Sequence, residues 1–236
     1  MADINEKIKF HRSGDLNFVI IVLVSLIPGI LWVRFFYYKD RFEQEPLFLL
    51  ARVFFAGAVA VVFAALFEYP FRSFLTKELS LITKALISFF VIGFGEEFFK
   101  AAAVYFTAYG SYELNEPVDG IIYGITAGIG FSVVENVLYT AAFGLSIVPF
   151  RAVTASLAHA CFSGIFGVFC GRAKFGQKPY TDLLKGLVYA AFMHGLYDFI
   201  IISQLFSPLA AVIMVVLSYF LLRYYILEAL TQSPFN

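Results

Sequence analysis

Long apolar runs constrain the fold of this chain more than any other feature of its sequence. A membrane-spanning α-helix needs about 20 mostly apolar residues, and about seven runs meet this length. Only 14% of the residues are charged and 61% are hydrophobic, whereas a soluble domain has roughly 25% charged residues. The sequence therefore predicts an all-α polytopic integral membrane protein. The predicted spanning runs are residues 16–36, 47–67, 84–109, 118–143, 147–170, 183–206 and 209–227.

These runs occupy almost the whole chain, so we expect one membrane-embedded domain over residues 1–236. Residues 79–94 are apolar enough to form an eighth crossing or a re-entrant element. The first run lacks the short apolar core and the cleavage site of a signal peptide, so we expect it to remain as an anchor. Lys and Arg number 17, as do Asp and Glu. The chain thus has no basic excess that would attract nucleic acid, and the lipid bilayer is its expected surrounding.

Seven ionisable side chains lie inside the predicted spanning runs. A charge near the bilayer centre is unfavourable by at least about 2.5 kcal/mol, so each of these residues is a candidate functional residue. Glu96, His159 and His194 fall close to the middle of their own runs, and Glu135 lies a little past the middle of its run. We therefore expect one polar cluster near the midplane. The seven residues are Glu96, Glu97, Lys100, Glu135, His159, His194 and Asp198.

The spacing of these residues indicates which of them share a helix face. Glu96 precedes Lys100 by four residues, which allows an ion pair, while Glu97 points elsewhere. His194 and Asp198 are also four apart, as suits two ligands of one metal or a histidine oriented by a carboxylate. Two imidazoles with carboxylates are typical of hydrolytic zinc sites, but proton-coupled transporters also place such groups at the midplane. Composition alone leaves both functions open.

Small residues recur every fourth position in two of the runs. This spacing lets two helix backbones approach closely, so we expect packing seams that set the distance between the helices carrying the polar groups. The residues are Gly120, Gly124 and Gly128 in one run and Ser163, Gly167 and Gly171 in the next.

Three linear motifs narrow the function. Residues 95–100 contain EExxK, residues 131–135 read FxxxE, and residues 194–198 read HxxxD. Together with His159-Ala160, the acidic segment 40–46 and the segment 119–124, they resemble the PrsW family of intramembrane proteases over roughly residues 32–200. That family is distantly similar to the CAAX prenyl protease and bacteriocin-processing families. Asp198 stands where the prenyl protease branch has Asn. An ionised Asp cannot donate to an oxyanion, so we expect Asp198 to be a metal ligand, a partner of His194 or a protonated acid.

The resemblance implies an intramembrane endopeptidase of a bacterial cell membrane, with its catalytic core at about residues 84–206. The expected substrate is a single-pass membrane protein, for which an anti-sigma factor in stress signalling is one candidate. Glu96 or Glu97 would be the general base, and Lys100 would neutralise the other glutamate. A zinc ion would be held by Glu135, His159 and His194, with Asp198 as helper or fourth ligand.

Three alternatives to a zinc-dependent protease remain open. In a metal-free glutamate protease the same Glu activates water directly, and only the metal version is sensitive to chelators. A proton-coupled transporter would use the carboxylates as a relay and would show flux without proteolysis. In a scaffold without chemistry, neutralising one member of the cluster would lower stability and leave function intact.

Overall fold

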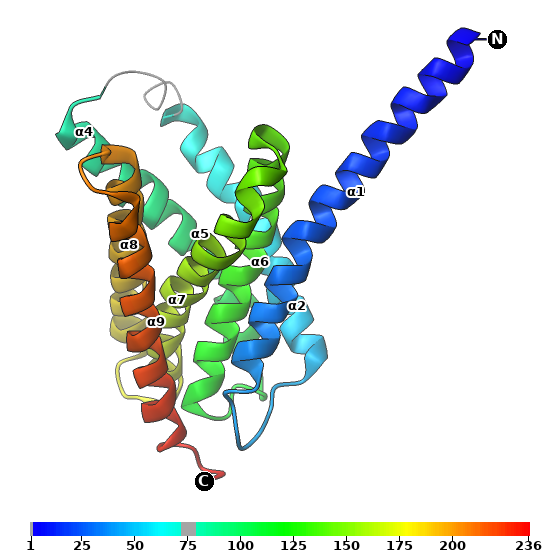
Figure 1. The fold of residues 1–236 in the computed structure, drawn as a ribbon. Helices are drawn as coiled ribbons and strands as arrows, with labels where there is room; N and C mark the ends of the chain where they lie inside the picture. The colour runs from blue at the N-terminus through cyan, green and yellow to red at the C-terminus, as the bar shows by residue number, and fades with distance from the viewer. Residues whose placement is uncertain (1, 72–78) are drawn as a thin grey trace.

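The computed structural model describes the backbone of residues 2–71 and 79–236 and the side chains of residues 18–71 and 79–236. This part of the chain is helical and contains no strand. It contains six long helices and one segmented helix, which runs from Leu81 to Tyr109 between the second and third long helices (Figure 1). The long helices are α1 (Ala2–Tyr37), α2 (Leu47–Glu68), α6 (Pro117–Phe143), α7 (Val148–Phe175), α8 (Pro179–Ser203) and α9 (Pro208–Leu230). The segmented helix comprises α4 (Leu81–Leu86), the π-helical η2 (Ile87–Gly93), α5 (Phe94–Val104) and the π-helical η3 (Tyr105–Tyr109).

The predicted all-α membrane fold is confirmed. Each of the six long helices is long and apolar enough to cross a membrane. The predicted run 84–109 corresponds to the segmented helix, whose π-helical turns interrupt its regular α-helical geometry. Residues 81–109 form one continuous helical segment, so residues 79–94 are the start of this segment and not an eighth crossing.

Prolines begin most of the long helices. Pro117, Pro149, Pro179 and Pro208 each occupy one of the first two positions of a helix. The first turn has no acceptor for its own N–H groups, so a residue that lacks an N–H and has a fixed φ is favourable there. Short 3-10 turns, η1 (Tyr69–Phe71) and η4 (Leu145–Ile147), follow α2 and precede α7.

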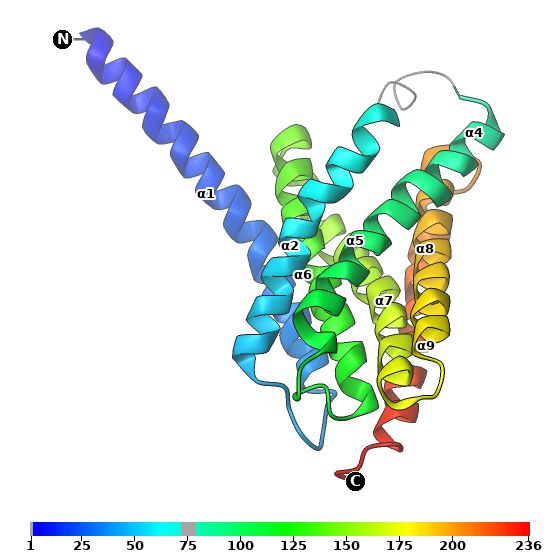
Figure 2. The ribbon, with the colours of Figure 1, turned by 180° about the vertical axis from the view of Figure 1, so that it is seen from behind.

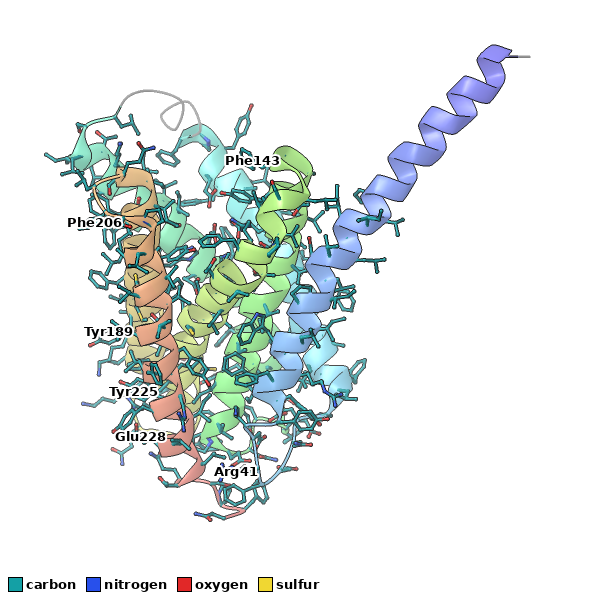
Figure 3. All side chains as sticks on the ribbon, in the orientation of Figure 1. Arg41, Phe143, Tyr189, Phe206, Tyr225 and Glu228 are labelled. Carbon is teal, nitrogen blue, oxygen red and sulfur yellow. The ribbon has the colours of Figure 1, made fainter. Side chains whose placement is uncertain are left out.

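Helices α6 and α7 form the centre of the bundle. In their apolar windows 78% and 89% of the residues are buried, compared with 11% in the membrane-spanning part of α1. The remaining helices surround this pair, and the N-terminal part of α1 extends away from the bundle (Figures 1 and 2). The surrounding helices bury one side and leave apolar side chains on the outside, such as Tyr189 of α8 (Figure 3). This surface suits contact with lipid.

The expected glycine seam lies between α6 and α7. A Cβ atom at Gly120 would lie 2.6 Å from the backbone nitrogen of Gly171, and one at Gly128 would lie 2.5 Å from the carbonyl oxygen of His159. Only glycine allows the two backbones to come this close. The prediction of close helix packing is confirmed, and the seam ends at the residue that carries a candidate functional imidazole.

The two ends of the bundle are distinct. The loops 38–46 and 110–116 and the C-terminus lie at one end, here called the C-terminal face, near Arg41 and Glu228 (Figure 3). Phe143 and Phe206 lie at the other end, here called the opposite face (Figure 3). The N-terminal end of α1 lies beyond the opposite face, so α1 begins and α9 ends on different sides of the bundle (Figure 1).

Candidate active site

The structure gathers the seven predicted polar residues into one cluster in the middle of the bundle. They come from four helices that follow one another along the chain, α5, α6, α7 and α8, and that pack together. Glu96, Glu97, Lys100, His159 and His194 are each at most 6% exposed. The central pair α6 and α7 holds Glu135 and His159, while α5 and α8 bring the other five residues against it.

Lys100 lies at the centre of this cluster. Its Nζ donates to Glu96 Oε2 and Glu97 Oε1, each at 2.9 Å, and to His159 Nδ1 at 2.8 Å. The ammonium also lies 4.0 Å from the centre of the Phe131 ring. The expected ion pair between Glu96 and Lys100 is present. The expectation that Glu97 points elsewhere is wrong, since Lys100 binds Glu97 as well. A lysine can reach both positions one turn earlier on its helix.

His159 is engaged at both ring nitrogens. Because Lys100 donates to Nδ1, the neutral imidazole carries its proton on Nε2 and donates it to Glu135 Oε2 at 2.8 Å. Glu135 is fixed in turn by Arg151, whose Nη2 donates to the same oxygen at 2.9 Å. Glu135 therefore orients His159 and is itself neutralised by Arg151.

His194 has one ring nitrogen that remains available. Its Nδ1–H donates to Glu97 Oε1 at 2.9 Å, while Glu97 Oε2 accepts from Ser163 Oγ at 2.9 Å. The other nitrogen, Nε2, lies 3.4 Å from Asp198 Oδ2 and 3.7 Å from Glu96 Oε2. Asp198 Oδ2 is buried and has no hydrogen-bond partner among the described residues. A lone pair of His194 and an unsatisfied carboxylate oxygen thus face the same space.

These groups form a donor set that fits a divalent metal. One donor atom each from Glu96, His159 and His194 lies within 4.8 Å of the other two. Around them the structure describes five carboxylates and two fixed cations, Lys100 and Arg151, which leaves an excess of three negative charges when all five carboxylates are ionised and both histidines are neutral. A divalent cation would offset most of this excess. The donor set is Glu96, His159 and His194, and the five carboxylates are Glu68, Glu96, Glu97, Glu135 and Asp198.

A cavity of about 380 Å³ gives access to the donor set. Its walls come from α2, η2, α5, α6, α7 and α8, and α2 and α4 diverge on this side toward the opposite face (Figure 2). Apolar side chains such as Val61, Ile92 and Ile201 line it together with the polar groups. Glu97 does not line the cavity, whereas Glu96 does, so the two adjacent glutamates have different surroundings. The ionisable lining residues are Glu68, Glu96, Glu135, Tyr139, Arg151, His159, His194, Tyr197 and Asp198.

The π-helical turn η2 brings α5 and α8 together beside His194. A Cβ atom at Gly93 would lie 2.6 Å from the backbone nitrogen of Gly195. A Cβ atom at Gly195 would lie 2.7 Å from the Cα of Phe89. This close approach holds the EExxK helix and the HxxxD helix in register.

Two residues of the site escaped the sequence analysis. Glu68 is the last residue of α2, and its buried Oε1 has no partner in the described part of the chain. Arg151 lies in the first turn of α7 and contacts both Glu135 and Asn136. Both residues lie near the ends of apolar runs, where a charge is usually exposed to water. A Glu directly after an apolar run that ends in Leu-Phe was the available signal for Glu68.

Comparisons with known proteins agree with the resemblance in the motifs. A family model described as PrsW family intramembrane metalloprotease matches residues 45–224. A Protease PrsW of Geobacillus kaustophilus is 34% identical over 185 residues, which cover 78% of this chain and 80% of the relative. The Protease PrsW of Shouchella clausii is 33% identical over 186 residues, covering 78% and 85%. That of Bacillus subtilis is 32% identical over 183 residues, covering 77% and 82%. No solved structure matches the chain.

The family assignment favours the metal-dependent enzyme over the metal-free protease, the transporter and the scaffold. It also agrees with a bundle whose long helices span a bacterial cell membrane. The chain belongs to the PrsW family of intramembrane metalloproteases.

Proposed function

We propose that this metalloprotease uses a zinc ion held by Glu96, His159 and His194 to hydrolyse a peptide bond in or near the transmembrane segment of a single-pass membrane protein. The observation that carries the proposal is the buried donor set of these three residues, whose donor atoms lie within 4.8 Å of one another beside a cavity. Two imidazoles and a carboxylate are a common ligand set of catalytic zinc.

The ring nitrogens differ in how readily they can become ligands. His194 Nε2 forms no hydrogen bond with a described residue and is directly available. His159 must release either Lys100 at Nδ1 or Glu135 at Nε2. We assign Lys100 the role of balancing Glu96 and Glu97, and Glu135 the role of orienting His159. When bound, the metal supplies a Lewis acid that polarises the scissile carbonyl and acidifies water.

Asp198 is the carboxylate best placed to move the proton of the attacking water. Its Oδ2 is buried, unpartnered among the described residues and oriented toward His194 Nε2 at 3.4 Å. Glu97, by contrast, accepts from Lys100, His194 and Ser163 and does not line the cavity. We therefore assign Glu97 to positioning His194, and Asp198 to taking the proton and passing it to the leaving amine.

The cavity supports a membrane-embedded peptide as substrate. Its lining alternates between the ionisable groups and apolar residues of α2, α6 and α8, and such walls accept the apolar side chains of a spanning helix. An extended stretch of such a helix would place its carbonyl groups near the donor set. An anti-sigma factor is one candidate substrate, on the basis of the family resemblance.

The experiment compares metal content and cleavage in the same variants. Protein purified without chelators is measured for zinc per chain, and cleavage is followed on a co-reconstituted single-pass membrane protein tagged at both ends. We expect about one zinc in the wild type, loss of zinc and cleavage in His194→Ala, and retained zinc with lost cleavage in Asp198→Asn. Zinc lost in Asp198→Asn but retained in Glu96→Gln would reverse the roles of these two carboxylates.

Two further results would reject the proposal. Folded wild-type protein without metal that cleaves in the presence of a chelator would establish the metal-free glutamate mechanism. Solute flux in sealed vesicles without cleavage of any tagged membrane protein would establish the transporter.

A further inference from the structure

A second buried acidic cluster lies at the C-terminal face, away from the candidate active site. Asp40 and Glu45 belong to the connection between α1 and α2, and Asp119 lies in the first turn of α6. They are 1%, 4% and 0% exposed. Both segments belong to the motif pattern noted in the sequence, yet neither takes part in the site described above. Asp119 precedes Glu135 by 16 residues on α6, a distance of about 24 Å along the helix axis.

The oxygen atoms of this second cluster converge on one point. One carboxylate oxygen each from Asp40, Glu45 and Asp119 lies within 4.8 Å of the other two. Asp119 Oδ2 accepts from the backbone N–H groups of Asn115 and Glu116, each at 2.8 Å, and this fixes the carboxylate. Glu45 accepts a hydrogen bond from the hydroxyl of Tyr123. Two of the three carboxylates are thus held in place by neighbouring groups.

Three of the remaining four oxygens of the cluster are unsatisfied. Both oxygens of Asp40 and Oδ1 of Asp119 are buried and have no hydrogen-bond partner among the described residues. Three buried acidic oxygens without a partner are rare in a native protein and call for a ligand, because each unpaired group is unfavourable by about 1–3 kcal/mol.

No positive charge balances this second cluster. Among the side chains that the structure describes, no Lys, Arg or His nitrogen forms a salt bridge with Asp40, Glu45 or Asp119. Glu116, which is also fully buried, adds a fourth acid close to Asp40. Four buried acids without a basic partner are unfavourable when they are ionised, and a bound cation would relieve this.

We propose that Asp40, Glu45 and Asp119 bind a hard divalent cation, magnesium or calcium, at the C-terminal face. All the donors are oxygens, which both ions prefer. Zinc sites, by contrast, usually contain imidazole or thiolate ligands. The bound cation joins the connection between α1 and α2 to the start of α6. It thereby fixes the helix that carries the glycine seam and Glu135.

The test is the thermal unfolding of full-length protein in detergent, freed of metal and then mixed with millimolar MgCl2 or CaCl2. We expect either salt to raise the Tm of the wild type by several degrees, because a ligand that binds only the folded state stabilises it. Asp40→Asn should lose this rise. It should also unfold at the same or a higher temperature than the wild type without cation, since the change removes a buried charge and breaks no hydrogen bond of a carboxylate oxygen.

Two variants serve as controls. Glu43→Gln changes an exposed acid of the same connection and should keep the full rise. Glu96→Gln changes the membrane-embedded donor set and should also keep it, which separates this proposal from the proposed function. If Asp40→Asn does not fold, the same test is made with Glu45→Gln, whose amide oxygen can still accept the hydrogen bond from Tyr123. Two results would overturn the proposal. One is that the cation does not raise the Tm of the wild type, and the other is that it raises the Tm of folded Asp40→Asn or Glu45→Gln as much as that of the wild type.

Discussion

The substitution Gly128→Ala tests whether the seam between α6 and α7 sets the geometry of the active site. The added Cβ would lie 2.5 Å from the carbonyl oxygen of His159 and 2.8 Å from Ser163 Oγ. Ordinary van der Waals contact begins at 3.4 Å, so α7 must move away from α6 by about 0.9 Å at the residue that carries a proposed ligand. A displacement of this size at a catalytic group lowers the rate by about 100-fold.

The same substitution two seam positions further away supplies a matched control. In Gly120→Ala the new Cβ would lie 2.6 Å from the nitrogen of Gly171, which is a similar clash about 12 Å along the helix from Gly128. Both variants should lose about 1–3 kcal/mol of stability through overpacking. Only Gly128→Ala should also lose cleavage by the folded fraction.

The assay is the initial rate of cleavage of a tagged single-pass membrane protein in proteoliposomes, divided by the amount of folded enzyme. Thermal unfolding of the same preparations gives the loss of stability. Gly110→Ala serves as the neutral reference, because no atom lies within 4 Å of its added Cβ. Equal rates in Gly128→Ala and Gly120→Ala, both within twofold of wild type, would refute the coupling of the seam to the site.

Three further predictions concern the network around the site. Lys100→Met leaves Glu96 and Glu97 without their cation and should lower the free energy of unfolding, measured by thermal unfolding, by about 3–5 kcal/mol. Adding Glu97→Gln to this variant should restore part of the lost stability. A double variant no more stable than Lys100→Met would contradict the ion-pair reasoning. Ser163→Ala removes a donor to Glu97 and should destabilise by about 1.5–3 kcal/mol with a reduced cleavage rate, whereas full cleavage would show that Glu97 does not position His194. Trp32→Phe removes the indole hydrogen bond to the Ala152 carbonyl and should lower stability by about 1 kcal/mol at an unchanged cleavage rate per folded molecule.

The sequence was sufficient to predict the helices and seven members of the polar cluster, but not Glu68 and Arg151. Long apolar runs have few alternatives in a bilayer, because every backbone polar group must be satisfied within the segment. The predicted run 118–143 differs from α6 by one residue at its start. Residues such as His159 stood out because an ionisable group near the middle of an apolar run is unfavourable unless it meets a partner.

The distribution of contacts within the cluster could not be predicted, because it depends on how the helices are rotated about their axes. Spacing along one helix paired Glu96 with Lys100, but only packing shows that Lys100 also reaches His159 from another helix. Arg151 competes for Glu135 from a position 16 residues away in sequence. Whether Glu135 and Asp198 are metal ligands, as the sequence suggested, stays a prediction for the metal measurements.

The π-helical turn η2 has a consequence for how the chain tolerates insertions and deletions. Each residue of an α-helix advances the side chains by about 100°, and a π-helical turn contains roughly one residue more than an α-helical turn. Deleting one residue from 87–93 would let the turn close as a regular α-helix. Glu96, Glu97 and Lys100 would then keep their phase relative to α4, because the shortened turn still completes 360° with one residue fewer. Deleting one residue from the regular helix α4 would instead rotate the residues on its two sides by about 100° relative to each other. The segmented helix can therefore lose a residue within η2 and keep these three side chains in phase with the histidines, whereas its regular turns cannot.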